Sequence, residues 1–125
     1  MTVELTSDVP GCEVRIAPQV IAAIAARAAA ATSGVVRLEP GVVGLVGSLV
    51  RTARGQLRGV EPASVDGVRV TDELRVEVDL VTSGQDQVAA VAGRVQRAVA
   101  TEVREATGLT VAEVLVTVLD VELAR

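Results

Sequence analysis

The chain of 125 residues contains no Phe, Tyr, Trp or His, and all twelve of its basic residues are Arg. Without histidine, the protein lacks the side chain that most often serves as a near-neutral acid–base catalyst and as a metal ligand. Without lysine, it can use neither Schiff-base chemistry nor the lysine of a phosphate-binding P-loop. Without aromatic rings, it has no side chain on which a nucleic-acid base could stack. These absences argue against an enzyme, a bound cofactor or metal, and a nucleic-acid partner.

Cysteine, long apolar runs and excess positive charge are scarce as well. The single cysteine, Cys12, cannot form an internal disulfide, which fits a reducing compartment. No apolar run approaches the length of a membrane span, and Glu4 and Asp8 interrupt any N-terminal signal sequence. The net charge of −4 is unlike that of a general nucleic-acid binder. We therefore expect a cytoplasmic protein that does not insert directly into a membrane.

The residues that are present suit one small domain. Half of them are hydrophobic, mostly Val and Ala, and the length allows the chain to bury most of its apolar surface. Residues 1–12 are polar and contain Pro10 and Gly11, which predicts a flexible N-terminal tail. Residues 13–123 are predicted to form the single domain.

The first half of this domain reads as a β-α-β unit. Residues 13–17 alternate between polar and apolar side chains, which predicts a short strand. Pro18 suits the first position of a helix, and the Ala-rich sequence that follows continues this helix until Gly34, a good left-handed cap. Residues 35–38 are predicted to form the second strand.

The second half predicts two strands, a helix and a last strand. Residues 64–71 form the third predicted strand, and residues 74–82 the clearest one, with one face buried and one face in water. Asp86 is predicted to cap an amphipathic helix that Gly108 ends. Residues 111–123 form the last strand, whose two apolar faces both require cover.

The order β-α-β, insert, β-β-α-β predicts the α+β class. In this architecture, a two-layer sandwich, two helices lie on one face of a small mixed sheet.

The insert is residues 41–59, a Gly-rich segment between Pro40 and Pro62. On a helix its apolar side chains fall on one side and its arginines on the other, a pattern typical of a contact surface. Three interpretations remain open: packing within the fold or between subunits, a flexible loop, and a helix on a membrane surface, which would bind weakly without aromatic anchors. The predicted interaction residues are Val42, Val46, Leu49, Val50, Arg51, Arg54, Leu57 and Arg58.

Two pairs of carboxylates are spaced two residues apart, Glu77 with Asp79 and Asp120 with Glu122. Such a pair could bind a cation or share a proton, but charge with a period of two on an outer strand face is more typical of simple solvation. Cys12 has no histidine to deprotonate it and is predicted to be an incidental thiol. We therefore predict no catalytic, cofactor or metal site.

Several segments, taken in order, resemble one known family. They are residues 13–25 (EVRIAPQVIAAIA) with the Ser-Gly-Val of 33–35, the Gly-rich GVVGLVG of 41–47, LRVEVDL of 74–80, and TGLTVAEVLVTV of 107–118. This ordered set resembles the alkaline-shock protein family, also called the Gls-type envelope stress response family of Gram-positive bacteria.

The resemblance implies a non-enzymatic cytoplasmic protein that associates with itself as a homo-oligomer. It also implies recruitment to the inner face of the cell membrane by a small membrane-anchored protein, and a role in cell-envelope homeostasis under stress. The alternative is a small α+β RNA-binding module, because the GxxG of residues 44–47 resembles a KH-type loop. The acidic net charge and the missing aromatic residues count against this alternative.

Overall fold

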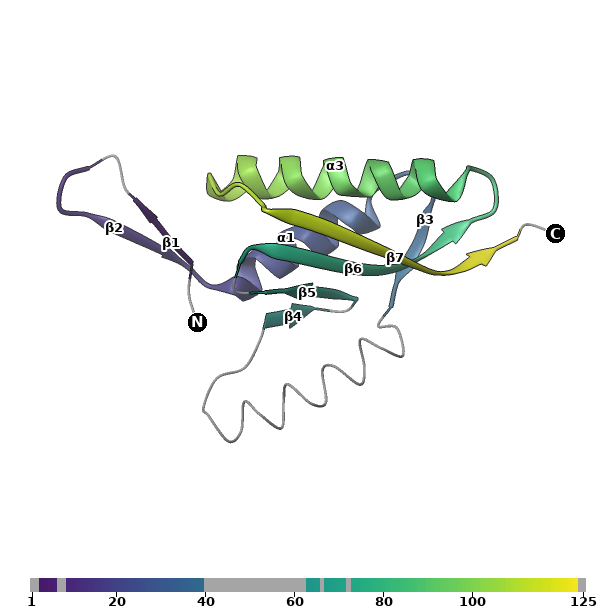
Figure 1. The fold of residues 1–125 in the computed structure, drawn as a ribbon, viewed down its shortest axis with the longest axis horizontal. Helices are drawn as coiled ribbons and strands as arrows, with labels where there is room; N and C mark the ends of the chain where they lie inside the picture. Colours follow the sequence, from purple (N-terminus) through teal and green to yellow (C-terminus); the bar gives the residue numbers. More distant parts are fainter. Residues whose placement is uncertain (1–2, 7–8, 40–62, 66, 72, 124–125) are drawn as a thin grey trace, which may run out of the picture.

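The computed structural model describes residues 3–6, 9–39, 63–65, 67–71 and 73–123 of the chain. Its helices and strands follow the sequence in an α+β arrangement (Figure 1). In order they are β1 (Val3–Thr6), β2 (Glu13–Ile16), α1 (Pro18–Ala30), β3 (Val35–Leu38), β4 (Ala63–Val65), β5 (Val68–Val70), β6 (Arg75–Ser83), α3 (Val88–Thr107) and β7 (Glu113–Glu122).

Strand β6 is the centre of a five-stranded sheet. β7 runs parallel to it along one edge, while β5 and β3 pair antiparallel with successive parts of its other edge, and β4 extends the sheet beyond β5. Asp79 lies where β5 and β3 meet, with its N–H donating to the Gly67 carbonyl at 2.7 Å and its carbonyl accepting from Glu39 N–H at 3.2 Å. The combination of parallel and antiparallel pairs confirms the predicted mixed sheet.

Both helices contribute to one core against the inner face of this sheet, as the two-layer prediction required (Figure 1). Small side chains allow close packing: Ala22, Ala25 and Ala29 of α1 are fully buried, and the buried face of α3 is entirely valine. Each fully buried valine contributes about 1.5–3 kcal/mol, so the core needs no aromatic residue. The inner face of the sheet supplies Val68, Val70, Val76, Val78 and Leu80.

The helix ends agree with the sequence in part. Pro18 stands in the first turn of α1, and Gly108 caps α3 with a φ of 80° and an N–H that donates to the Arg104 carbonyl at 2.8 Å. The predicted cap at Asp86 is wrong, because the N-cap is Gln87, which makes no side-chain capping bond. Gly34 has a φ of 97° but lies beyond the end of α1, in the turn to β3.

Three details of the strands differ from the prediction. β2 pairs antiparallel with β1 in a separate two-stranded sheet, so the predicted β-α-β unit is wrong. β1 lies within the segment predicted to be a flexible tail. The single strand predicted over residues 64–71 is the hairpin of β4 and β5, in which Gly67 takes a φ of 74°. These pairings depend on contacts between separate segments, which periodicity within one segment does not reveal.

Candidate interaction surface

The predicted interaction residues of the insert lie outside the described residues. This holds for Val42, Val46, Leu49, Val50, Arg51, Arg54, Leu57 and Arg58, and also for the GxxG of residues 44–47. The role assigned to the insert therefore stays a prediction. The surfaces that can be built from atoms are the outer face of the sheet, the outer edge of β7 and the β1–β2 hairpin.

A nearly buried ion pair crosses the outer face of the sheet. Arg69 of β5 donates from Nη1 to Asp79 Oδ2 of β6 at 2.8 Å and from Nη2 to Asp79 Oδ1 at 3.2 Å. The two side chains are 13% and 5% exposed, and Glu77 lies 3.8 Å from Arg69 Nε. The hydrogen bond to Asp79 raises the pKa of Arg69 despite the opposing effect of burial. Glu77 and Asp79 therefore face an arginine, and the prediction that both are simply solvated is wrong for Asp79.

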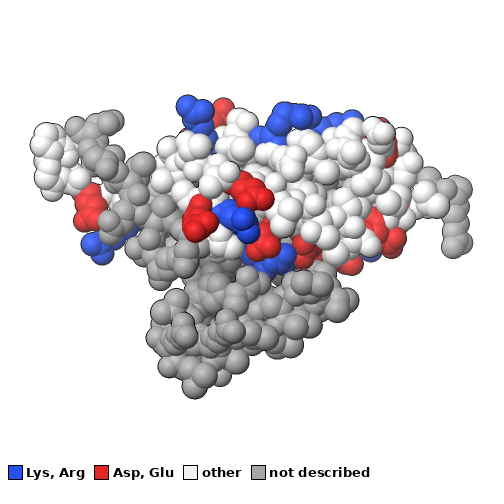
Figure 2. All heavy atoms as spheres, in the orientation of Figure 1, with Lys and Arg blue, Asp and Glu red and all other residues white. Residues whose placement is uncertain are grey.

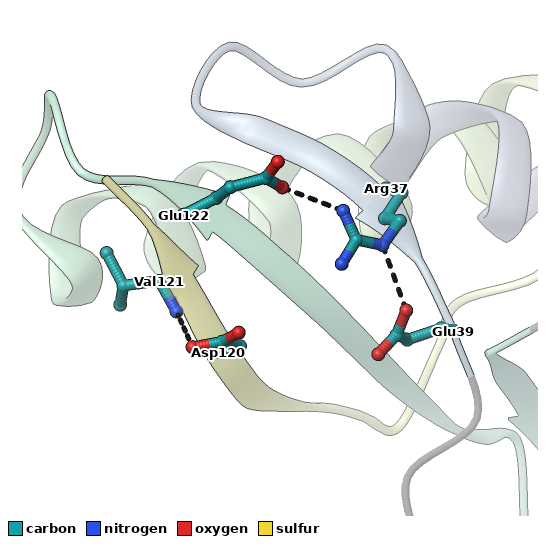
Figure 3. Close-up of polar contacts among 5 residues, drawn as sticks. All are labelled: Arg37, Glu39, Asp120, Val121 and Glu122. Carbon is teal, nitrogen blue, oxygen red and sulfur yellow. Dashed lines mark hydrogen bonds and ion pairs between the residues drawn. The ribbon is translucent and has the colours of Figure 1, made fainter. Parts of the chain in front are cut away.

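Two further arginines tie strands together on the surface. Arg37 of β3 donates from Nε to Glu39 at 2.9 Å and from Nη1 to Glu122 of β7 at 2.7 Å (Figure 3). Arg75 of β6 lies 2.9 Å from Glu113 of β7. These pairs are about half exposed, so water screens them and each contributes little to stability. Acidic and basic side chains interleave on the face seen in Figure 2, which presents no broad field of one sign.

The acidic side chains and the cysteine of the described residues do not gather into a metal site. No group of three or more His, Cys, Asp or Glu side chains among them could hold a metal ion. Cys12 is exposed beside the turn that joins β1 to β2, where its N–H donates to the Val9 carbonyl at 3.1 Å.

Strand β7 forms one edge of the sheet, since within the described part of the chain it pairs only with β6. Its inner side chains, Val114, Val116 and Val118, pack against the core but are only partly buried. On its other face, Leu115 is 44% exposed. The core therefore covers the inner face of this strand in part, and the cover expected for both faces from the insert or another subunit stays a prediction.

Two side chains close parts of the β7 edge. Gln96 of α3 donates from Nε2 to the Val114 carbonyl at 3.1 Å, and the Val121 N–H donates to Asp120 Oδ1 at 2.8 Å (Figure 3). Capping of this kind protects an edge strand from indiscriminate pairing. The stretch between these caps is the open part of the edge.

The β1–β2 hairpin projects from one end of the molecule (Figure 1). Val9, in the loop between its strands, and Val14, in β2, are 58% and 42% exposed. Ile16, at the end of β2, packs against the core and anchors the hairpin. A two-stranded sheet is marginally stable alone in water, so this hairpin depends on its anchor.

Sequence reasoning missed the Arg69–Asp79 pair and the edge position of β7. The first carried no local signal, because the two residues lie in separate strands of a fold whose pairing was unknown. The second carried none either, because the apolar side chains at both odd and even positions of residues 113–122 are typical of a strand covered on both faces, wherever it lies in the sheet.

No helix among the described residues is both long enough and apolar enough to cross a membrane.

Comparison with known proteins supplies the context for these surfaces. Neither the curated proteins nor the solved structures contain a match to the chain. The model of the alkaline shock protein family, described as having a cell envelope-related function, matches residues 9–123. This is the family that the ordered segments resembled. The match spans nearly all of the 125 residues, and the chain therefore belongs to the alkaline shock protein family.

Proposed function

We propose that this protein is a non-enzymatic scaffold of the cell envelope that associates with itself and is held at the inner face of the membrane by a small membrane-anchored protein. The observation that carries the proposal is the match to a family with a cell envelope-related function over residues 9–123. The family match indicates the cell envelope. The proposal adds to it the scaffold role, the self-association and the membrane-anchored partner.

The chemistry of the described surface supports a binding role. The arginines of the outer sheet face pair with carboxylates of neighbouring strands and so hold the strands together. Partly exposed apolar side chains follow the edge of β7 and the hairpin of β1 and β2. Surfaces of this kind gain free energy when another polypeptide covers them, since burial contributes about 25 cal/mol per Å².

Two measurements in the native host test the proposal. Fractionation should recover the protein with the membrane, and deletion of the partner identified by crosslinking should release it. In vitro, light scattering at micromolar concentration should give a mass above that of the monomer. A protein that remains monomeric, and that stays away from the membrane fraction, would contradict the scaffold role.

A further inference from the structure

The outer edge of β7 is the most specific contact surface that the described residues offer. We propose that two copies of this chain pair antiparallel along this edge, about a two-fold axis at Val116, and so join their sheets into one. The inference rests on the self-association proposed above and names the surface that brings it about.

The direction of the backbone groups of β6 establishes which side of β7 is open. Arg75 accepts from Thr71 N–H at 3.0 Å, and Asp79 N–H donates to the Gly67 carbonyl at 2.7 Å. The backbone groups of these two β6 residues therefore point toward β5 and away from β7. Because successive residues of a strand alternate in direction, the residues between them, such as Val76, point toward β7.

The register of the parallel pair then assigns the residues of β7. Val76 lies opposite Val114 in the register. In a parallel ladder, the N–H and the C=O of such a residue bond not to its partner but to the residues just before and just after that partner. Glu113 and Leu115 therefore bond to β6, and the backbone groups of Val114, Val116 and Val118 point outward. The bond from the Gln96 side chain to the Val114 carbonyl agrees with this assignment, and the second lone pair of that oxygen can still accept from a paired strand.

The sequence of β7 is self-complementary about Val116. An antiparallel copy centred there places Val116 opposite the Val116 of the other copy, and Val114 opposite Val118. β-branched side chains therefore meet at each of the three residues whose backbone groups point outward. All three valines are partly exposed at the edge, and the second copy would cover them. On the other face, the half-exposed Leu115 falls opposite Thr117.

Among axes at the outward residues of β7, the axis at Val116 pairs the most valines, and the acidic side chains of the strand do not face one another there. The charged side chains of β7 are all acidic, so a self-pair is acceptable only where no two carboxylates face each other. About Val116, Glu113 falls opposite Leu119, and Asp120 falls opposite Ala112. An axis at Val118 would instead bring the register shift beside Leu119 into the centre of the ladder.

A proline scan of the edge tests the pairing in solution. Val116→Pro removes an N–H that points outward and makes no bond to β6, and proline is tolerated at such edge positions. The variant should keep the far-ultraviolet circular dichroism of the wild type. In sedimentation equilibrium, its dimer dissociation constant should rise at least about tenfold, because each copy loses a backbone bond and a buried side chain.

A cysteine pair tests the register itself and does not depend on the proline variant folding. In a Cys12→Ser background, Leu115→Cys with Thr117→Cys places thiols on facing residues of the two copies. Their Cα atoms would lie about 4.5 Å apart, within reach of a disulfide. The control is Leu123→Cys in the same background, since Leu123 is 74% exposed but lies far from the axis.

The expected result is that mild oxidation crosslinks the Leu115→Cys, Thr117→Cys protein into dimers faster than the Leu123→Cys control. If the wild type forms oligomers while Val116→Pro dissociates no more readily and the cysteine pair crosslinks no faster than the control, the β7 pairing is overturned and the scaffold proposal stands. A wild type that is monomeric throughout would overturn both.

Discussion

Thr82 of β6 gives the sharpest test of the packing described above. It is fully buried between Val35 of β3 and Val121 of β7, and its Oγ1 has no hydrogen-bond partner among the described residues. At the low end of its range an unsatisfied buried hydroxyl costs about 1 kcal/mol, and the methyl group that replaces it in valine contributes about 0.8 kcal/mol. Because threonine and valine have the same shape, we expect Thr82→Val to stabilise the fold by about 1–2 kcal/mol.

Urea denaturation and calorimetry would measure this gain. The free energy of unfolding should rise without a change in the m-value, and Tm should rise by about 4–8 °C for a domain of this size. Thr82→Ser is the matched control, because it keeps the hydroxyl and deletes the methyl, and it should destabilise by about 1 kcal/mol. If Thr82→Val is no more stable than the wild type, the hydroxyl has a partner and the reasoning is refuted.

Three further substitutions have defined outcomes in the same denaturation assay. Arg69→Met should lower the free energy of unfolding by about 3 kcal/mol, because it leaves the buried carboxylate of Asp79 without its arginine, and adding Asp79→Leu should recover most of the loss. Additive effects of the two substitutions would contradict this. Gly34→Ala should cost about 1–3 kcal/mol, since φ is 97° and the new Cβ would lie 2.6 Å from Val91 Cγ2; wild-type stability would rule out the strain. Gly93→Ala should stabilise the fold by about 1 kcal/mol, because alanine favours the helix more than glycine and the added Cβ meets only the flexible Arg97 side chain, at 3.4 Å. A lower free energy of unfolding would show that the added Cβ is crowded.

The elements with a strong internal period could be predicted from the sequence. The valines of α3 recur at helical spacing and residues 74–80 alternate, so both elements are found in the structure. The wet outer face predicted for β6 is wrong in part, because Asp79 and Val81 are buried along with its inner face. Gly108 ends α3 as predicted, because its left-handed φ suits glycine above other residues. The order of these segments also sufficed to identify the family.

The pairings of short segments could not be predicted in the same way. Residues 13–16 read correctly as a strand, but nothing within them indicates that their partner is β1 rather than the main sheet. Asp86 had the chemistry of a helix cap, yet its carboxylate binds Arg94 at 2.9 Å, a residue on the following helix. In each case a contact made by the folded chain outweighed a local preference.

The sequence by itself determined the fold class of this protein and its family. These are properties of composition and local order, which do not depend on what lies beside a segment. Only the tertiary structure decided that Asp79 is buried against Arg69, that β5 and β3 share one edge of β6, and that β7 is left at the other. Those outcomes depend on which strands meet, because burial and hydrogen bonding are set by neighbours distant in the chain.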